Sequence, residues 1–281
     1  MRKSNWILVC FPLLLLAGCS GFQRSFGNPG GESIQKEAIT PTQAPGIVYV
    51  CPFTSEPIKV DGFLDEPVWE KAQIVNFTVP KTHDEWLLNK PAAYAKPFSK
   101  TEARVLYDQK YLYVGIKAYD QDIWSYYKER DSNTYLEDVL EVFLKPDPVA
   151  HPDGPDPYYN FEINALGTVL DAFNVKRGGA GNYTRWSDWN CEGLKIAIQI
   201  KGTLNDWRDK DEYWTLEVAI PFAGLPSLNG KAPKKGNVWL FNLARYDYSV
   251  YLPNGVELSS YSPLSWANFH LYEDWAKLRF E

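Results

Sequence analysis

The sequence has few of the side chains that hold soft metals or haem. Its 281 residues include three His, four Cys and a single Met, which is Met1. Haem iron takes axial ligands such as His or Met, and no Cys-x-x-Cys-His motif for haem attachment occurs. An electron-transfer protein would have to use a pair drawn from His83, His151 and His270. The sequence therefore gives little support to electron transfer through haem.

The chain also lacks a run rich in Lys and Arg. Its 29 Lys and Arg face 35 Asp and Glu, which gives a formal net charge of −6 and a pI near 5.3. Binding to nucleic acid depends on clustered cations that neutralise phosphates, so we expect no nucleic-acid partner. Aromatic side chains are abundant instead, at 15% of the residues, and they can build either a core or a binding surface.

A long apolar run is missing as well. The run over residues 6–17 is interrupted by Pro12 and is shorter than the about 20 residues that a helix needs to cross a bilayer. Basic residues precede it, and Leu-Ala-Gly-Cys ends it at Cys19. This arrangement resembles the signal of bacterial lipoproteins, in which cleavage before the Cys is followed by its acylation. The resemblance implies a signal peptide at residues 1–18 and a lipid anchor at Cys19, which would hold the protein in the bacterial envelope, at the outer membrane or the cell surface. An ordinary signal peptide that happens to contain Cys is the alternative.

The remainder of the chain divides into a tether and one domain. Residues 19–46 are rich in Gly, Ser, Pro and Thr without an apolar period, which is typical of a flexible tether. Residues 47–281 show no break in composition and no internal repeat. Two of the cysteines, Cys51 and Cys191, fall in this domain. An exported compartment permits a disulfide between them, and two buried free thiols are the equal alternative.

Alternation of apolar and polar residues predicts strands throughout the domain. In residues 111–119, the side chains of Leu112, Val114, Ile116 and Ala118 are expected on one face. Residues 139–144 are apolar on both sides apart from Glu141, which is typical of a central strand. Further strands are expected at residues 101–107, 158–164, 168–175, 194–200, 213–220, 238–245 and 277–280. Short helices are expected only at residues 66–72 and 221–225. The pattern predicts an all-β fold, a single antiparallel β-sandwich of jelly-roll type with few short helices.

A series of short motifs runs in a fixed order along the domain. The motifs are Val-Asp-Gly-Phe-Leu-Asp-Glu-Pro-Val-Trp at 60–69, Glu-Asp-Val-Leu-Glu-Val-Phe at 137–143, Phe-Glu-Ile-Asn-Ala-Leu-Gly at 161–167, Ala-Ile-Pro-Phe at 219–222 and Asn-Phe-His at 268–270. Their ordered set resembles carbohydrate-binding module family 9 and the wider set of domains like it, over residues 47–281. The resemblance implies a β-sandwich that accompanies xylanases and related enzymes and grips a reducing-end sugar between two aromatic rings. Some members carry structural calcium.

The resemblance also implies candidate site residues. The family's first aromatic platform is a Trp in a Trp-x-x-Asp-x-x-Glu pattern, which here falls on Tyr135, followed by Asp138 and Glu141. Glu141 matches a residue that hydrogen-bonds sugar hydroxyls. Glu162 stands where the ligand-binding member has an Arg, which is a reversal of charge.

The second platform falls on Phe269 by spacing, and Trp266 offers a larger plane three residues earlier. Asn164 and Asn268 are candidates for further hydrogen bonds to hydroxyls. The chemistry of sugars independently favours such a set, because a pyranose needs an aromatic plane for its C–H face and carboxylates or amides for its rim. The partner implied is an oligosaccharide or polysaccharide, of plant type such as a glucan or xylan.

Several alternatives stay open at this point. Glu141 could pair with Arg104 or Arg245 instead of a ligand, and the domain could be a degenerate family member that serves a structural or interaction role. A glycosidase needs two carboxyls about 5 Å or about 6.5–9.5 Å apart, and sequence does not set that distance. No Gly-x-Ser-x-Gly or His-Glu-x-x-His motif is present. We therefore expect a non-catalytic protein that supports polysaccharide breakdown or uptake.

A metal site has little support from the residues themselves. The Pro-rich segment at residues 152–157, together with Asp147, could offer oxygen ligands to calcium, but it lacks the spacing of an EF-hand. A solvated turn is the alternative. Structural calcium otherwise enters only through the family resemblance.

Overall fold

The computed structural model describes residues 46–281, except 89, 91–94, 178–182 and 187–188. The predicted signal peptide, the acylated Cys19 and nearly all of the predicted tether lie outside the described residues. Within the described part of the chain, no helix is both long and apolar enough to cross a membrane.

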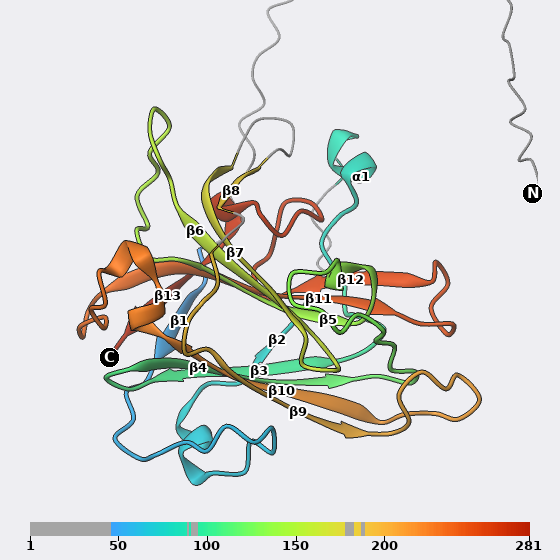
Figure 1. The fold of residues 1–281 in the computed structure, drawn as a ribbon. Coiled ribbons are helices and arrows are strands. Elements are labelled where there is room, and N and C mark those ends of the chain that lie inside the picture. Colours follow the sequence, from blue (N-terminus) through green and yellow to red (C-terminus); the bar gives the residue numbers. More distant parts are fainter. Residues whose placement is uncertain (1–45, 89, 91–94, 178–182, 187–188) are drawn as a thin grey trace, which may run out of the picture. The chain divides into compact units, whose positions relative to one another are not determined.

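Two β-sheets make up most of the described domain (Figure 1). The eight-stranded sheet runs in the order β1 (Val48–Cys51), β13 (Ala276–Phe280), β11 (Val238–Tyr248), β5 (Val139–Lys145), β6 (Tyr158–Asn164), β7 (Val169–Arg177) and β8 (Tyr183–Trp186), with β12 (Val256–Ser260) also paired to β11. The five-stranded sheet runs in the order β2 (Val75–Asn76), β3 (Thr101–Tyr107), β4 (Tyr111–Tyr119), β10 (Tyr213–Pro221) and β9 (Lys195–Lys201). Among these described strands, all neighbours are antiparallel except β1 and β13, which are parallel. The predicted β-sandwich is confirmed.

Helices are short. The segments predicted at 66–72 and 221–225 form the 3-10 helices η1 (Pro67–Lys71) and η4 (Phe222–Gly224). The structure adds the 3-10 helices η2 (Thr134–Leu136), η5 (Pro226–Leu228) and η6 (Tyr272–Asp274) and the single-turn helix α1 (His83–Leu87).

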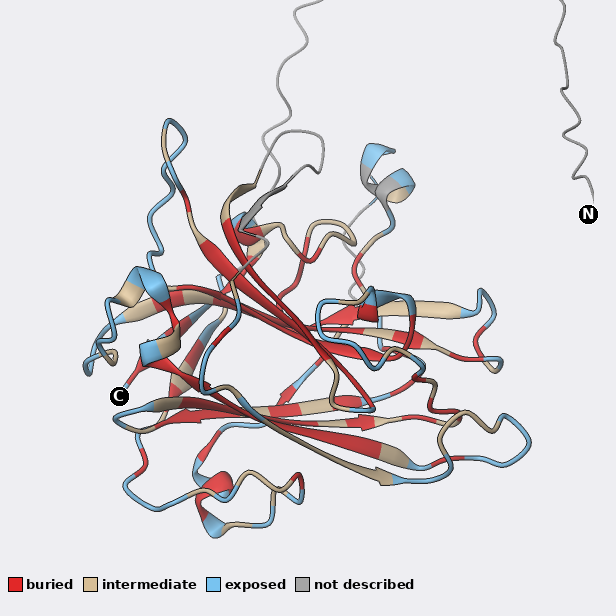
Figure 2. Ribbon diagram, in the orientation of Figure 1, coloured by how far each residue is buried: buried red, intermediate tan, exposed pale blue. Residues whose placement is uncertain are grey.

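The core lies between the sheets, where alternate residues of both meet (Figure 2). Ile116 and Leu216 of the five-stranded sheet and Val142 of the eight-stranded sheet are fully buried there. The predicted inward face of residues 111–119 is confirmed, because its four apolar side chains all belong to this cluster. The strand alternation therefore leaves the opposite residues of each sheet on an outer face.

Both outer faces are partly covered by loops. On the eight-stranded sheet, residues 261–275 pack Phe269 and Trp275 against Phe143 and Tyr158. On the five-stranded sheet, residues 60–69 pack against β4 at Gly115. A Cβ at Gly115 would meet the Leu64 side chain at 2.7 Å, so the close approach of this loop requires glycine.

Both cysteines of the domain are free and buried. Burial raises the pKa of the Cys191 thiol to about 12 and raises the pKa of the Cys51 thiol as well. Of the two alternatives for this pair, the structure has the free thiols.

Candidate functional site

A pocket of about 440 Å³ opens on the outer face of the eight-stranded sheet. Strands β5, β6, β7 and β11 form its floor, and η2 and residues 266–270 border it. Six predicted site residues, which are distant in the sequence, line it together: Tyr135, Glu141, Glu162, Trp266, Asn268 and Phe269. We call this space the first pocket.

Two carboxylates lie side by side on its floor. Glu141 of β5 and Glu162 of β6 are direct partners in the strand register, and both are buried. The Asn160 amide donates a hydrogen bond of 2.8 Å to Glu162 Oε1. Burial, followed by the nearby charge of Glu162, raises the pKa of Glu141 well above its usual value. The Glu141 carboxyl therefore holds a proton more tightly than a carboxyl group in water.

The two arginines considered as partners of Glu141 do not fill that role. Arg245 lies on the inner side of β11, where its guanidinium contacts Asp120 at 2.7 Å and Asp247 at 3.1 Å. Arg104 belongs to β3 in the other sheet. That interpretation is wrong because strand alternation sends Arg245 to the opposite face from Glu141.

The aromatic platforms differ in exposure. Tyr135 has 38% of its surface exposed, whereas Phe269 has only 3%. The Phe269 ring packs edge-on against Tyr246 at 5.2 Å, and its carbonyl accepts a hydrogen bond from Trp275 Nε1 at 2.8 Å. Phe269 is therefore mainly part of the packed covering. Trp266, which is half-buried, is better placed to present a plane to a ligand.

Of the two asparagines predicted to bind sugar hydroxyls, only one lines the pocket. Asn268 lines the pocket, although its Oδ1 accepts the His270 backbone N–H at 3.1 Å. Asn164 does not line it. The Asn164 amide donates to the Tyr127 carbonyl at 2.8 Å, and its Oδ1 accepts the Thr168 backbone N–H at 2.8 Å. Asn164 therefore stabilises a turn and is not among the residues that line the first pocket.

Seven residues that line this pocket were not predicted, and three of them are polar strand residues: Asn160, Asn174 and Tyr246. Asn160 Oδ1 and Asn174 Nδ2 are buried without a hydrogen-bond partner among the described residues. A buried polar group left unbonded costs about 1–3 kcal/mol, which a hydroxyl of a ligand or a water would relieve. Polar residues at alternate strand positions were the available signal for the two amides. Tyr246 lies just beyond the end of the strand predicted at 238–245.

Calcium can be tested at two places. In the loop after β5, the Lys145 ammonium lies 2.7 Å from Asp156 Oδ1 and 2.9 Å from the Val149 carbonyl, and it also bonds the Asp147 carbonyl. The predicted calcium ligands of this loop therefore surround a lysine.

The second place is a buried set of three carboxylates, Asp120, Asp138 and Asp247, with one oxygen of each within 4.8 Å of the others. The oxygen ligands suit calcium in type. The Arg245 guanidinium already contacts two of the three, and Asp138 accepts the backbone N–H groups of Trp124 and Tyr248 at 2.6 and 2.7 Å. One guanidinium therefore offsets only part of the negative charge of three carboxylates, and both Asp247 oxygens lack a hydrogen-bond partner among the described residues. The donor set, with this remaining negative charge, fits a cation such as calcium in type.

The family model described as "Carbohydrate family 9 binding domain-like" matches residues 60–250. The chain belongs to this family. No curated protein sequence is similar enough to the chain to count as a match.

Solved structures agree with the fold of this family 9-like domain. One is from Bacteroides uniformis and carries a provisional assignment as a carbohydrate-binding protein, with 15% identity and a TM-score of 0.61 over 84% of this chain and 100% of that chain. Another is a carbohydrate binding module family 9 from Caldicellulosiruptor kristjanssonii in complex with glucose, with 14% identity and a TM-score of 0.50 over 83% and 95% of the two chains. At these identities the likeness shows the shared fold.

Glu141 and Glu162 of this family 9-like domain are poorly arranged for glycoside hydrolysis. Such chemistry needs two carboxyls that flank the scissile bond. Glu141 and Glu162 project from one face of one sheet as direct register partners, which places their Cα atoms about 4.5–5.5 Å apart. Both therefore approach a bound sugar from the same side.

Proposed function

We propose that this protein binds carbohydrate without catalysis, and that the first pocket holds the end of an oligosaccharide or polysaccharide. One observation carries this proposal. Two accessible aromatic side chains, Tyr135 and Trp266, line the same pocket as two carboxyl groups and two amide atoms that have no hydrogen-bond partner among the described residues. Membership of the family supports it, and so does the glucose bound by the family member from Caldicellulosiruptor.

The chemistry of the pocket matches the surface of a pyranose. Its C–H face would pack on the Trp266 or Tyr135 ring. Its rim hydroxyls would donate to Glu141, Glu162 and Asn160 Oδ1, and accept from Asn174 Nδ2. A volume of about 440 Å³ is within the usual range of about 300–1,000 Å³ for small-ligand sites, which suits the end of a glycan.

We further propose that acylated Cys19 tethers the domain to the bacterial envelope. A tethered binding domain raises the local concentration of glycan, which would support breakdown or uptake of a polysaccharide such as a plant-type glucan or xylan. Labelling of cells with a tagged fatty acid tests the anchor. The wild-type chain should carry the label, and a Cys19→Ser variant should not. A label retained by the variant would remove this part of the proposal.

Binding is tested by calorimetric titration of the full chain with Cys19→Ser, so that no acyl group is added. The probes are glucose, cellobiose, xylobiose and the corresponding polysaccharides. We expect saturable binding of at least one series, and no release of reducing sugar. Failure of every probe to bind would contradict the carbohydrate proposal, and release of reducing sugar would contradict the non-catalytic part.

A further inference from the structure

We propose that the outer face of the five-stranded sheet carries a second binding site, which takes a sugar bearing a carboxylate, such as a hexuronate. The site is a recess of about 420 Å³ formed by β3, β4, β9, β10 and residues 62–64. It uses the sheet that does not contribute to the first pocket. We call it the second pocket.

The wall of the second pocket is fixed to the sheet by hydrogen bonds. Gln199 Nε2 donates to the Asp61 carbonyl at 2.8 Å, and Thr215 Oγ1 donates to the Gly62 carbonyl at 2.6 Å. Glu217 Oε2 accepts the backbone N–H groups of Asp61 and Gly62 at 2.9 and 2.8 Å. Gly62 has a φ of +87°, a conformation that favours glycine. The recess is therefore built into the fold.

Three cations line this recess, and one of them, Lys201, pairs with Glu212 at 2.9 Å. Arg104 of β3 pairs with Gly115 of β4, and Lys117 lies two residues further along β4, so Arg104 and Lys117 are diagonal neighbours with Cα atoms about 7–8 Å apart. Neither makes an ion pair with a described carboxylate. Arg104 Nε is buried without a hydrogen-bond acceptor in the described structure. A ligand oxygen would relieve the cost of that unbonded N–H.

Aromatic rings hold Lys117 in place. Its ammonium lies 3.7 Å from the centre of the Tyr213 ring and 5.0 Å from that of Tyr119. Rings attract a cation through their quadrupole but carry no net charge, so the positive charge stays uncompensated. Glu102 is the register partner of Lys117, but its carboxylate lies 2.5 Å from Lys100. Lys117 is therefore ordered and still able to attract an anion.

Buried cations elsewhere in the domain, unlike Arg104 and Lys117, form ion pairs with carboxylates of the chain. Arg245 contacts Asp120 and Asp247 at 2.7 and 3.1 Å, and Lys145 contacts Asp156 at 2.7 Å. These cations have carboxylates of the same chain beside them, because a buried charge needs a partner. At the second pocket, the one lining carboxylate of the described residues, Glu102, pairs with Lys100, and Arg104 and Lys117 have no ion pair. We therefore infer that their carboxylate comes from the ligand.

The remaining lining favours a sugar over a simple anion. A recess of about 420 Å³ is larger than one ion requires and lies within the range for small organic ligands. Phe63, which is 60% exposed, stands at its border and offers an apolar plane. A planar guanidinium binds carboxylate through two parallel hydrogen bonds. A hexuronate combines that carboxylate with a C–H face that can pack on the ring.

The test compares sodium glucuronate with glucose at equal ionic strength, using the full chain with Cys19→Ser and following backbone amide signals by NMR. We expect glucuronate to shift the signals of residues 62–64 and 215 and to bind there about tenfold more tightly than glucose. Arg104→Gln should abolish that preference, and Arg104→Lys should restore part of it. Lys117→Gln should weaken glucuronate binding several-fold and serves as a second variant.

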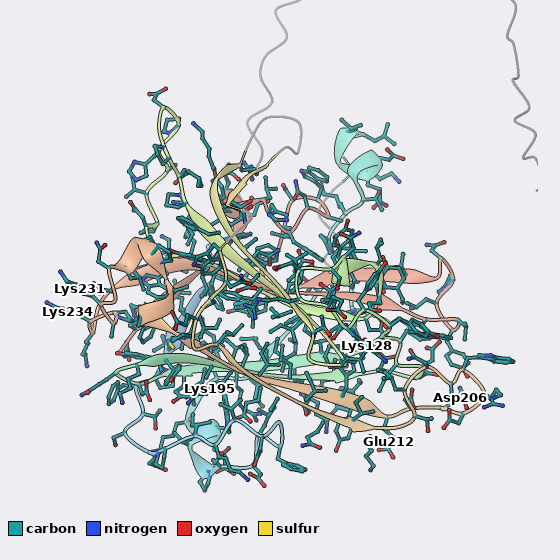
Figure 3. The ribbon with its side chains drawn as sticks, viewed as in Figure 1. Lys128, Lys195, Asp206, Glu212, Lys231 and Lys234 are labelled. Carbon is teal, nitrogen blue, oxygen red and sulfur yellow. The ribbon has the colours of Figure 1, made fainter. Side chains whose placement is uncertain are left out.

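Lys195→Gln is the matched control. Lys195 lies on β9 of the same sheet (Figure 3), and its ammonium also lies over a tyrosine ring, 4.5 Å from the centre of Tyr111, but it does not line the recess. This variant should bind glucuronate as the parent does. The proposal is overturned if glucose binds the recess as tightly, if Arg104→Gln and Lys117→Gln change nothing in folded protein, or if sulfate displaces glucuronate at equal concentration. Glucose binding at the first pocket shifts the amide signals of a different set of residues. A failure of the proposed function can therefore be distinguished from a failure of the second-pocket proposal.

Discussion

The two outer faces of the sandwich carry pockets of similar size and different charge. The first pocket, of about 440 Å³, has Glu141 and Glu162 on its floor, whereas the second, of about 420 Å³, has Arg104 and Lys117. Both floors are made of strands whose alternate residues build the same core. Strand alternation therefore lets one sequence fix the core with half of its strand residues and set the chemistry of each face with the other half.

The covering loops differ as well. Residues 261–275 bring aromatic side chains over the first pocket, including the half-buried Trp266. Residues 62–64 border the second pocket. This segment is held by hydrogen bonds from the backbone of Asp61 and Gly62 to Glu217, and by hydrogen bonds from Gln199 and Thr215. The first face therefore relies on aromatic planes and the second on charge. We therefore expect ligand affinity at the two faces to respond differently to neutral sugars, to salt and to replacement of acidic side chains by amides.

The largest expected effect is the loss of neutral-sugar binding when Trp266 is replaced. Trp266→Ala removes the larger accessible plane of the first pocket, so we expect affinity for the best neutral probe to fall by at least about tenfold. Calorimetry measures this, with Trp207→Ala as the control, because Trp207 is an exposed tryptophan outside both pockets. Equal affinities of the Trp266 variant and the parent would mean that the aromatic plane is not used.

A smaller effect is expected on folding stability from Glu141. Its pKa is raised in the folded state, so the folded protein retains a proton that the unfolded chain has lost. The free energy of unfolding should therefore fall as pH rises above the unfolded pKa of about 4.3 and through the higher folded value. Glu141→Gln removes this loss and should raise the free energy of unfolding at pH 7 relative to the parent, while neutral-sugar binding weakens.

Urea denaturation at a series of pH values measures this effect. Glu212→Gln is the control, since Glu212 is an exposed carboxylate (Figure 3) in a surface ion pair with Lys201. Part of the pH slope should remain in the Glu141 variant, because burial also raises the pKa of Asp120, to about 7. An unchanged slope in Glu141→Gln would show that this carboxyl is not protonated in the folded state.

The sequence was sufficient for much of the fold because alternation is a local property. The strand expected at residues 111–119 matches β4 residue for residue, and the strand at 139–144 is central in its sheet. The parallel pairing of β1 with β13 was not foreseeable, since it joins the two ends of the domain. Helix α1 is a single turn without a clear apolar period.

The lining of the first pocket was predictable where a motif marked it. The family pattern led to Tyr135, Glu141 and Phe269, although burial makes Phe269 a packing residue. It also led to Asn164, which the structure places in a turn. Which amide stays unbonded, or which cation lacks an acid, depends on neighbours from several strands. The second pocket could not be predicted from the sequence for that reason. Only the register of β3, β4 and β10 brings Arg104 and Lys117 together on one face of the sheet.

The smallest expected effect is that of salt on ligand affinity, and it distinguishes the two pockets by the charge of the ligand that each binds. Lys117 and Arg104 are partly open to solvent, so dissolved ions screen their attraction for a carboxylate. We expect affinity for glucuronate to fall several-fold between about 50 and about 500 mM NaCl, where the Debye length shrinks to a few ångströms. Affinity for a neutral sugar in the first pocket should stay constant over this range, because stacking and neutral hydrogen bonds involve no net charge on the ligand. NMR titration of one sample with both sugars gives the two salt dependences side by side. Equal dependence of the two affinities on NaCl concentration would contradict this comparison, because only the second pocket is expected to bind its ligand through an ionic charge.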